Sequence, residues 1–263
     1  MNQFKIIIAT QSDTFVIPTC IERVFRSFAI DIQSVIVIDG KESLRSKALI
    51  MWKRFGSVAI IKLALKTTVN KGLDIIDQLT GRLFLSKAYT IQGFCKKNKI
   101  EFIQTNNINQ KKMLEKIQQY APDTLVSFSA PQVFKPALLA IPKYGCINLH
   151  CSLIPKHRGL LPSFWALYFQ DDFGGATVHM MGEGIDDGDI LNQEKICIKH
   201  ADNMYDVIQK TKHLGTDLMI KTLHQMMSGT LAPLKNVIDN GNYNHFPTQA
   251  EANEFRRRGY RLI

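Results

Sequence analysis

Near its start the sequence reads Phe4-Lys5-Ile6-Ile7-Ile8-Ala9, and a second β-branched run, Val35-Ile36-Val37-Ile38-Asp39, follows later. Between the two runs, apolar residues recur at the spacing of one helix face over residues 17–28. Strand, helix and strand in this order predict one βαβ unit, in which both strands lie parallel in the same sheet. This stretch therefore sets the expected fold class.

The alternation continues along the rest of the chain. We expect strands at residues 101–104, 124–128, 146–150, 176–181 and 190–198, and helices at residues 91–98, 111–120 and 204–227, the last ended by Gly229. The sequence thus predicts an α/β fold, with a mostly parallel twisted sheet, helices on both faces, and ligands at the carboxyl ends of the strands. No GxGxxG motif follows the first strand, so a dinucleotide cofactor is not expected.

The composition is that of a globular protein, 45% hydrophobic and 21% charged over 263 residues, which excludes disordered and fibrous architectures. Lys and Arg total 33 against 23 Asp and Glu, and the net charge of +10 favours polyanionic partners. Residues 41–90 hold ten Lys or Arg against three acids. We interpret this segment as a basic helical insert, either solvated or a surface for phosphate groups or anionic lipid.

The five cysteines are scattered and form no CxxC pair, which predicts reduced thiols and a cytoplasmic location. Cys146, His150, Cys151 and His157 match no common zinc spacing, so no metal is expected. The longest apolar-leaning segment, residues 58–73, is interrupted by three lysines and is too short and too charged to span a bilayer.

The residues with the clearest chemistry lie between 145 and 191. Asn148 and His150 are two apart on a predicted strand, so their side chains leave it on the same face. An acidic, glycine-punctuated loop at residues 182–189 follows a second strand and can bring a carboxylate back over the end of the first. Taken singly, each feature also has a purely structural explanation. His150 fits a hydrogen-bonded structural histidine, Asn148 fits a residue that caps a turn, and the acidic loop fits a hairpin connection.

Two segments carry a family resemblance. They read Asn148-Leu149-His150-x-Ser152-Leu153-Ile154-Pro155-x-x-Arg158-Gly159-x-x-Pro162 and Gly175-x-Thr177-x-His179-x-Met181-x-x-Gly184-Ile185-Asp186-x-Gly188-Asp189-Ile190-Leu191. Together they resemble the signature of the formyltransferases that use 10-formyltetrahydrofolate. The resemblance is good over residues 91–230 and loose before them, and His157 replaces an aromatic residue often found there. It implies a Rossmann-like formyltransferase fold, with a catalytic domain at residues 1–235 that includes the insert, and a short C-terminal extension at residues 236–263.

The resemblance implies that Asn148, His150 and Asp186 are the catalytic residues. Formyl transfer to an amine passes through a tetrahedral intermediate whose oxygen gains negative charge. Asn148 and a protonated His150 are expected to donate hydrogen bonds to that oxygen, and one such donor contributes roughly 3 to 4 kcal/mol. Asp186 is expected to raise the pKa of His150 and to relay the proton that the amine loses.

The resemblance also implies the donor, 10-formyltetrahydrofolate, and the residues around it. The pterin is expected at Ser129, Gln132, Val133, Phe134, Gly184 and Ile185. Val133 and Phe134 fit ordinary core positions equally well. Phosphates of the acceptor are expected at Lys156, His157 and Arg158, for which a solvated turn is the alternative.

The expected acceptor is a small-molecule amine, a nucleotide-linked amino sugar of bacterial polysaccharide (O-antigen, lipopolysaccharide) synthesis. The tail after the last helix is too short for the C-terminal barrel of methionyl-tRNA formyltransferases, and the glycine-rich phosphate loop of phosphoribosylglycinamide formyltransferases is missing. Nucleic acid is not favoured, a membrane partner is not expected, and a homodimer is one option. The alternatives are formylation of methionyl-tRNA, formylation of an amine such as N-hydroxyornithine, and a non-catalytic folate or nucleotide-sugar binding protein.

Overall fold

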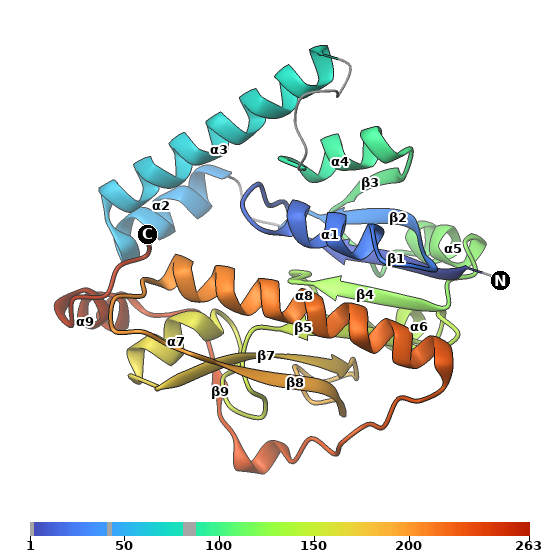
Figure 1. The fold of residues 1–263 in the computed structure, drawn as a ribbon. Coiled ribbons are helices and arrows are strands. Elements are labelled where there is room, and N and C mark those ends of the chain that lie inside the picture. Colours follow the sequence, from blue (N-terminus) through green and yellow to red (C-terminus); the bar gives the residue numbers. More distant parts are fainter. Residues whose placement is uncertain (1–2, 41–43, 81–87) are drawn as a thin grey trace.

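The computed structural model describes residues 3–40, 44–80 and 88–263 (Figure 1). Within these ranges seven strands form one sheet in the order β3-β2-β1-β4-β5-β7-β8. The first five run parallel, and β7 and β8 are antiparallel to their neighbours. In chain order the strands are β1 (Phe4–Thr10), β2 (Ile30–Ile38), β3 (Glu101–Thr105), β4 (Thr124–Phe128), β5 (Cys146–His150), β7 (Phe173–Met180) and β8 (Ile190–Cys197).

Helices cover both faces of this sheet, as Figure 1 shows. Buried side chains of α1, α4 and α8 form one core cluster, and those of α5 and α6 form the cluster on the other face. The predicted α/β class, mostly parallel with helices on both faces, is confirmed. The helices are α1 (Ile17–Phe25), α2 (Leu44–Phe55), α3 (Ser57–Leu79), α4 (Ile91–Asn98), α5 (Lys111–Gln119), α6 (Pro136–Leu139), α7 (Pro162–Tyr168), α8 (Met204–Ser228) and α9 (Gln249–Arg257).

The boundaries of the first βαβ unit differ from the expected ones. α1 ends at Phe25 instead of residue 28, and Ala29 adopts a left-handed backbone (φ 64°) directly before β2. β2 begins at Ile30, earlier than expected, because Ile30 and Ile32 point into the core and alternate with partly exposed polar residues. The strand order reverses between β1 and β4, and in doubly wound sheets ligands bind beyond the carboxyl ends of the strands at such a point.

Helix α8 crosses the sheet with close backbone packing at Gly215. Its ends follow the expectation: a capping box of Asn203 and Asp206 begins the helix, and Gly229 ends it in a left-handed conformation (φ 68°). A Cβ added at Gly215 would lie 2.3 Å from Leu149 Cδ1 of β5. Leu149 is itself only 2% exposed, so its side chain has little room to move.

We expect Gly215→Ala to lower the free energy of unfolding by about 1–3 kcal/mol, because overpacking against Leu149 exceeds the gain in helix propensity, which is about 1 kcal/mol. Urea unfolding followed by circular dichroism measures the change. Lys221→Ala, at an exposed position of the same helix, is the control and should change stability by less than about 0.5 kcal/mol. A stabilised Gly215→Ala variant would contradict the packing described.

The predicted basic insert contains two helices, α2 and α3, joined at Gly56 (φ 87°). Residues 41–43 and 81–87 of the insert, and the side chains of Arg45 and Lys47, lie outside the described structure. The inner side of α3 meets the body through Ala59 and Leu63, which belong to a core cluster, and through polar groups further along the helix. Lys66 Nζ donates to Tyr205 Oη at 2.5 Å, and the side-chain amide of Asn70 donates to the Thr14 carbonyl.

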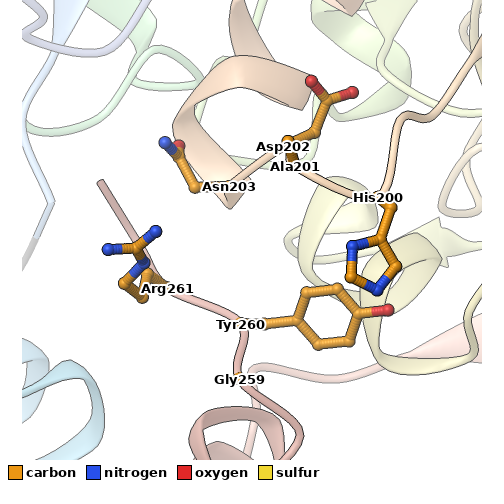
Figure 2. Close-up of a pocket in the computed structure, with 7 residues that line it drawn as sticks. All are labelled: His200, Ala201, Asp202, Asn203, Gly259, Tyr260 and Arg261. Carbon is orange, nitrogen blue, oxygen red and sulfur yellow. The ribbon is translucent and has the colours of Figure 1, made fainter.

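The segment after α8 folds back onto the body. β9 (Tyr243–Asn244) pairs in parallel with β6 (Arg158–Gly159), the loop strand that follows β5. Phe255 of α9 is fully buried and stacks on Phe164 of α7 at 4.5 Å between ring centroids. Figure 2 shows the pocket that this segment forms with the residues directly before α8, lined by His200, Ala201, Asp202, Asn203, Gly259, Tyr260 and Arg261. Within the described ranges, no helix has the length and apolar character needed to cross a bilayer.

Candidate active site

The candidate site lies where β5 ends. Asn148 and His150 leave β5 on the same face, because they are two residues apart on a strand. Asp186 reaches them from the loop between β7 and β8, where its backbone is left-handed (φ 51°). Its Oδ1 lies 3.4 Å from Asn148 Nδ2, and its Oδ2 lies 3.4 Å from His150 Nδ1. The structure therefore brings together the three residues that the sequence singled out.

Asp186 is held through both its side chain and its backbone. The Gly159 N–H donates to Asp186 Oδ2 at 2.8 Å, and the Asn236 side-chain amide donates to the Asp186 carbonyl at 3.0 Å. Burial alone would raise the pKa of Asp186, but two neighbouring histidines and the Gly159 N–H together hold that pKa well below its usual range. Asp186 is therefore a carboxylate at neutral pH.

His150 is buried, and its tautomer is fixed by a backbone contact. Its Nε2 lies 2.8 Å from the His157 carbonyl oxygen, which only accepts, so Nε2 carries the hydrogen. In the neutral ring the lone pair is then on Nδ1, beside Asp186. Burial lowers the pKa of His150, and the opposing effect of Asp186 is smaller. Asp186 does act to raise this pKa, as expected, but desolvation of the ring outweighs the carboxylate, so the net shift is downward and the expected imidazolium is not favoured.

A pH titration tests the state of His150. A lowered pKa keeps the ring neutral as the pH falls through 6.5, the ordinary histidine value, and protonation follows only at lower pH. We expect the His150 ring signal in an NMR titration to have its midpoint below 6.5 and kcat to fall over the same range. The signal is identified by its absence in the His150→Asn variant. A midpoint at or above 7 would show that the carboxylate dominates instead.

His179 is a member of the site that sequence reasoning did not single out. It lies on β7 directly across from Asn148 in the antiparallel β5–β7 pair. Its Nδ1 lies 2.7 Å from the Met180 carbonyl oxygen, and its Nε2 lies 3.1 Å from Asn148 Nδ2 and 3.4 Å from Asp186 Oδ1. His179 thereby orients the Asn148 amide. The signal in the sequence was its place in the motif, but its partner follows only from the strand register.

The loop after β5 is fixed by the side chain of His157. His157 is 3% exposed, its Nε2 lies 2.6 Å from Asp171 Oδ2, and its Nδ1 lies 3.0 Å from Asn244 Nδ2. Lys156 Nζ donates to the same Asp171 at 2.7 Å. These contacts engage Lys156 with Asp171, and His157 with Asp171 and Asn244, and they hold the carbonyl that His150 contacts. Arg158 differs, because its Nε is buried without a hydrogen-bond partner among the described residues.

Among the residues expected near the pterin, Val133 and Ile185 are 50% and 42% exposed, whereas Phe134 is 1% exposed in the core. Gln132 bridges two loops, accepting from the Ile108 N–H at 3.0 Å and donating to the Asn106 carbonyl at 2.6 Å. The exposed Val133 and Ile185 are thus free to contact a ligand, and Phe134 and Gln132 support the surrounding structure.

Two more of the expected residues have distinctive surroundings. A Cβ added at Gly184 would lie 2.1 Å from Asp187 Oδ2, so the loop as folded leaves no room for a side chain there. Ser129, directly after β4, has a left-handed backbone (φ 57°), and its hydroxyl accepts from Lys212 Nζ of α8. Lys212 is 6% exposed, which places a buried cation at the carboxyl end of β4.

These observations define a doubly wound α/β protein with an amide, an imidazole and a carboxylate at its strand ends. Residues 76–223 match the family described as formyl transferase, and this match covers more than half of the chain. The chain belongs to the formyl transferase family.

Among its relatives, the methionyl-tRNA formyltransferase of Ehrlichia canis is 36% identical over 148 residues, 56% of this chain and 48% of that protein. The chain spans about half the length of several curated relatives that it matches. Among solved structures, a 4-N formyltransferase from Francisella tularensis has 20% identity and a TM-score of 0.60, covering 98% of this chain and 88% of that one.

An N-formyltransferase from Helicobacter canadensis, in complex with folinic acid and dTDP-3-aminofucose, has 16% identity and a TM-score of 0.58. That match covers 97% of this chain and 80% of the other. At these identities the likeness to both solved structures shows the shared fold.

Proposed function

We propose that this protein is an N-formyltransferase that moves the formyl group of 10-formyltetrahydrofolate to the amino group of a nucleotide-linked amino sugar. The observation that carries the proposal is the convergence of Asn148, His150 and Asp186 at one strand end, each within 3.4 Å of its neighbour in the set. Family membership and a similar fold that binds folinic acid and dTDP-3-aminofucose in Helicobacter canadensis support it.

In the proposed reaction the acceptor amine attacks the formyl carbon, a new C–N bond forms, and the bond to the folate nitrogen breaks. His150 Nδ1 takes the proton that the amine loses, and the resulting imidazolium lies between the Asp186 carboxylate and the His157 carbonyl. The same proton then passes to the departing folate nitrogen. His150 is thus the proposed base, and Asp186 stabilises its charged form.

Asn148 is the proposed donor to the oxygen that becomes negative. One of its amide hydrogens points to His179 at 3.1 Å and the other to Asp186 at 3.4 Å. The second contact is long, so that hydrogen is readily given to the formyl oxygen as charge develops there. An oriented amide of this kind stabilises the intermediate more than it stabilises the bound substrate.

Charged groups near the carboxyl ends of β1 and β4 limit where the phosphates of the acceptor can bind. Asp13 Oδ1 accepts from the backbone N–H groups of Phe15, Val16 and Ile17 at 2.8, 2.9 and 3.0 Å, so a carboxylate of the chain itself occupies the start of α1. A substrate phosphate at that helix end would meet this carboxylate. Lys212 and Arg158 are the proposed partners for the diphosphate of the acceptor, because neither side chain pairs with a carboxylate among the described residues.

The rival within the family is formylation of methionyl-tRNA, which the names of the sequence relatives favour. It predicts tRNA binding whose affinity falls steeply with salt, since each phosphate contact releases counterions. N-hydroxyornithine and non-catalytic ligand binding remain further alternatives.

The deciding experiment offers the protein 10-formyltetrahydrofolate with a panel of nucleotide-linked amino sugars, N-hydroxyornithine or methionyl-tRNA, and follows release of tetrahydrofolate. The proposal expects turnover with at least one amino sugar and none with the other two. Turnover with methionyl-tRNA, or with N-hydroxyornithine alone, would transfer the assignment to that acceptor. Folate binding without turnover on any acceptor would support a binding protein.

A further inference from the structure

The outer face of α3 carries an exposed apolar stripe. Its large apolar side chains are 49–81% exposed, although the helix belongs to a folded body. They are Val58, Ile61, Leu65, Val69, Ile75, Ile76 and Leu79. Monomeric proteins rarely expose a contiguous apolar surface of this extent, so a stripe of this kind indicates an interaction site. Figure 1 shows α3 at the edge of the molecule, with the other elements on one side of it.

The stripe follows the heptad spacing of paired helices. Positions 58, 65, 72 and 79 form one row and positions 61, 68 and 75 form the second, as a and d positions do in a coiled coil. The middle of the stripe holds the small residues Thr68 and Gly72, and a Cβ at Gly72 would meet nothing within 4 Å. Small residues at this point let a second helix approach closely.

We propose that α3 docks against α3 of a second copy of this chain, antiparallel and about a two-fold axis near residue 70. In this register Ile61 faces Leu79 of the partner helix, Leu65 faces Ile75, and Thr68 faces Gly72. The row at positions 65, 72 and 79 of one helix packs against the row at positions 61, 68 and 75 of the other. The two-fold axis repeats this contact with the two helices exchanged, which makes the interface isologous. The proposal is independent of which amine is formylated.

The buried area fits a second copy of the chain as the occupant. Fourteen apolar side chains from two copies, each losing on the order of 100 Å², bury roughly 1,400 Å², within the range of stable interfaces. The exposed Lys62 and Lys71 flank the stripe on opposite sides. In this antiparallel arrangement Lys62 lies on the side of the partner's Val69 and Ile76, and the two Lys71 side chains lie on one side near the two-fold axis, where their long stems keep the ammonium groups in water. A lipid surface fits less well, because interfacial helices keep their basic polar face in water, whereas the polar side of α3 binds Tyr205 and Thr14.

Sedimentation equilibrium of the full chain tests the proposal. We expect a concentration-dependent mass approaching twice 29.9 kDa. Leu65→Lys should weaken the dimer by on the order of 100-fold, because the two-fold axis places the new charge in apolar contacts twice. Phe28→Lys, at a position 79% exposed and outside α3, is the matched control and should leave the dimer intact. Circular dichroism checks that both variants fold.

Cross-linking tests the register. In a Cys197→Ser background, which removes an exposed thiol, mixing Leu65→Cys with Ile75→Cys should give a disulfide between the two variants, and neither alone should cross-link. A monomer at all concentrations would overturn the proposal, as would a dimer indifferent to Leu65→Lys or a Leu65→Cys self-cross-link. A monomer that sediments with phosphatidylglycerol vesicles would show that the stripe binds lipid instead.

Discussion

Replacing Asp186 with asparagine is expected to lower kcat by about 10³-fold. The carboxylate is the only acid within 3.4 Å of His150 among the described residues, and it stabilises the imidazolium formed when the ring takes the amine proton. An asparagine of the same shape removes that charge, and its NH₂ group can donate to His150 Nδ1 and occupy the lone pair that acts as base. Steady-state release of tetrahydrofolate measures the loss.

The control for this variant is Asp187→Asn, which changes the adjacent carboxylate of the same loop. Asp187 Oδ1 is buried without a hydrogen-bond partner among the described residues, its carboxylate lies over Gly184, and no hydrogen bond or ion pair is described between it and Asn148, His150 or Asp186. It should keep kcat within about tenfold. Both variants should still bind tetrahydrofolate with unchanged affinity. If Asp186→Asn retained more than a tenth of the activity, the proposed role of the carboxylate would be wrong.

The sequence predicted the part of the site that depends on strand geometry. Side chains alternate along a strand, so Asn148 and His150 had to share a face of β5, and the parallel strands had to end at a common edge. The roles of these residues came from the family resemblance. The approach of Asp186 depends on a left-handed backbone and on the Gly159 N–H, neither of which has a signal in the sequence.

Backbone and register contacts account for what sequence reasoning missed. The partner of His150 Nε2 is a main-chain carbonyl, which every residue has, so nothing distinguished His157 in that role. His179 orients Asn148 only because β5 and β7 pair antiparallel, and their orientation was not predicted. The net pKa shift of His150 depends on how deeply the fold buries the ring, and one sequence does not give that depth.

The overall fold, like the site, was predicted from the sequence only in part. Hydrophobic periodicity predicted the α/β class and the parallel strands, because buried strands and amphipathic helices differ in period. α3 shows where periodicity is insufficient. Its spacing would place all of its apolar residues in the core, yet only Ala59 and Leu63 pack there, whereas Leu65 and Leu79 are exposed and the polar Lys66 and Asn70 bind the body.

Replacing Asn148 with alanine is expected to lower kcat by about 10²–10³-fold, the cost of removing one preorganised donor to a developing oxyanion. The KM values of both substrates should change by less than about threefold, because this hydrogen bond gains its strength only as charge moves onto the formyl oxygen. Asn148→Asp should lose more, since a second carboxylate beside Asp186 would repel that charge.

The control for the Asn148 variants is Asn192→Ala on β8, whose amide donates to Thr222 and Gln225 of α8, outside the candidate site. Its loss should affect stability and leave kcat within a few-fold. The division between kcat and KM separates two roles for Asn148. A fall in kcat alone is the result that oxyanion stabilisation requires, whereas a rise in KM with kcat kept within tenfold would mean that Asn148 only positions the substrate.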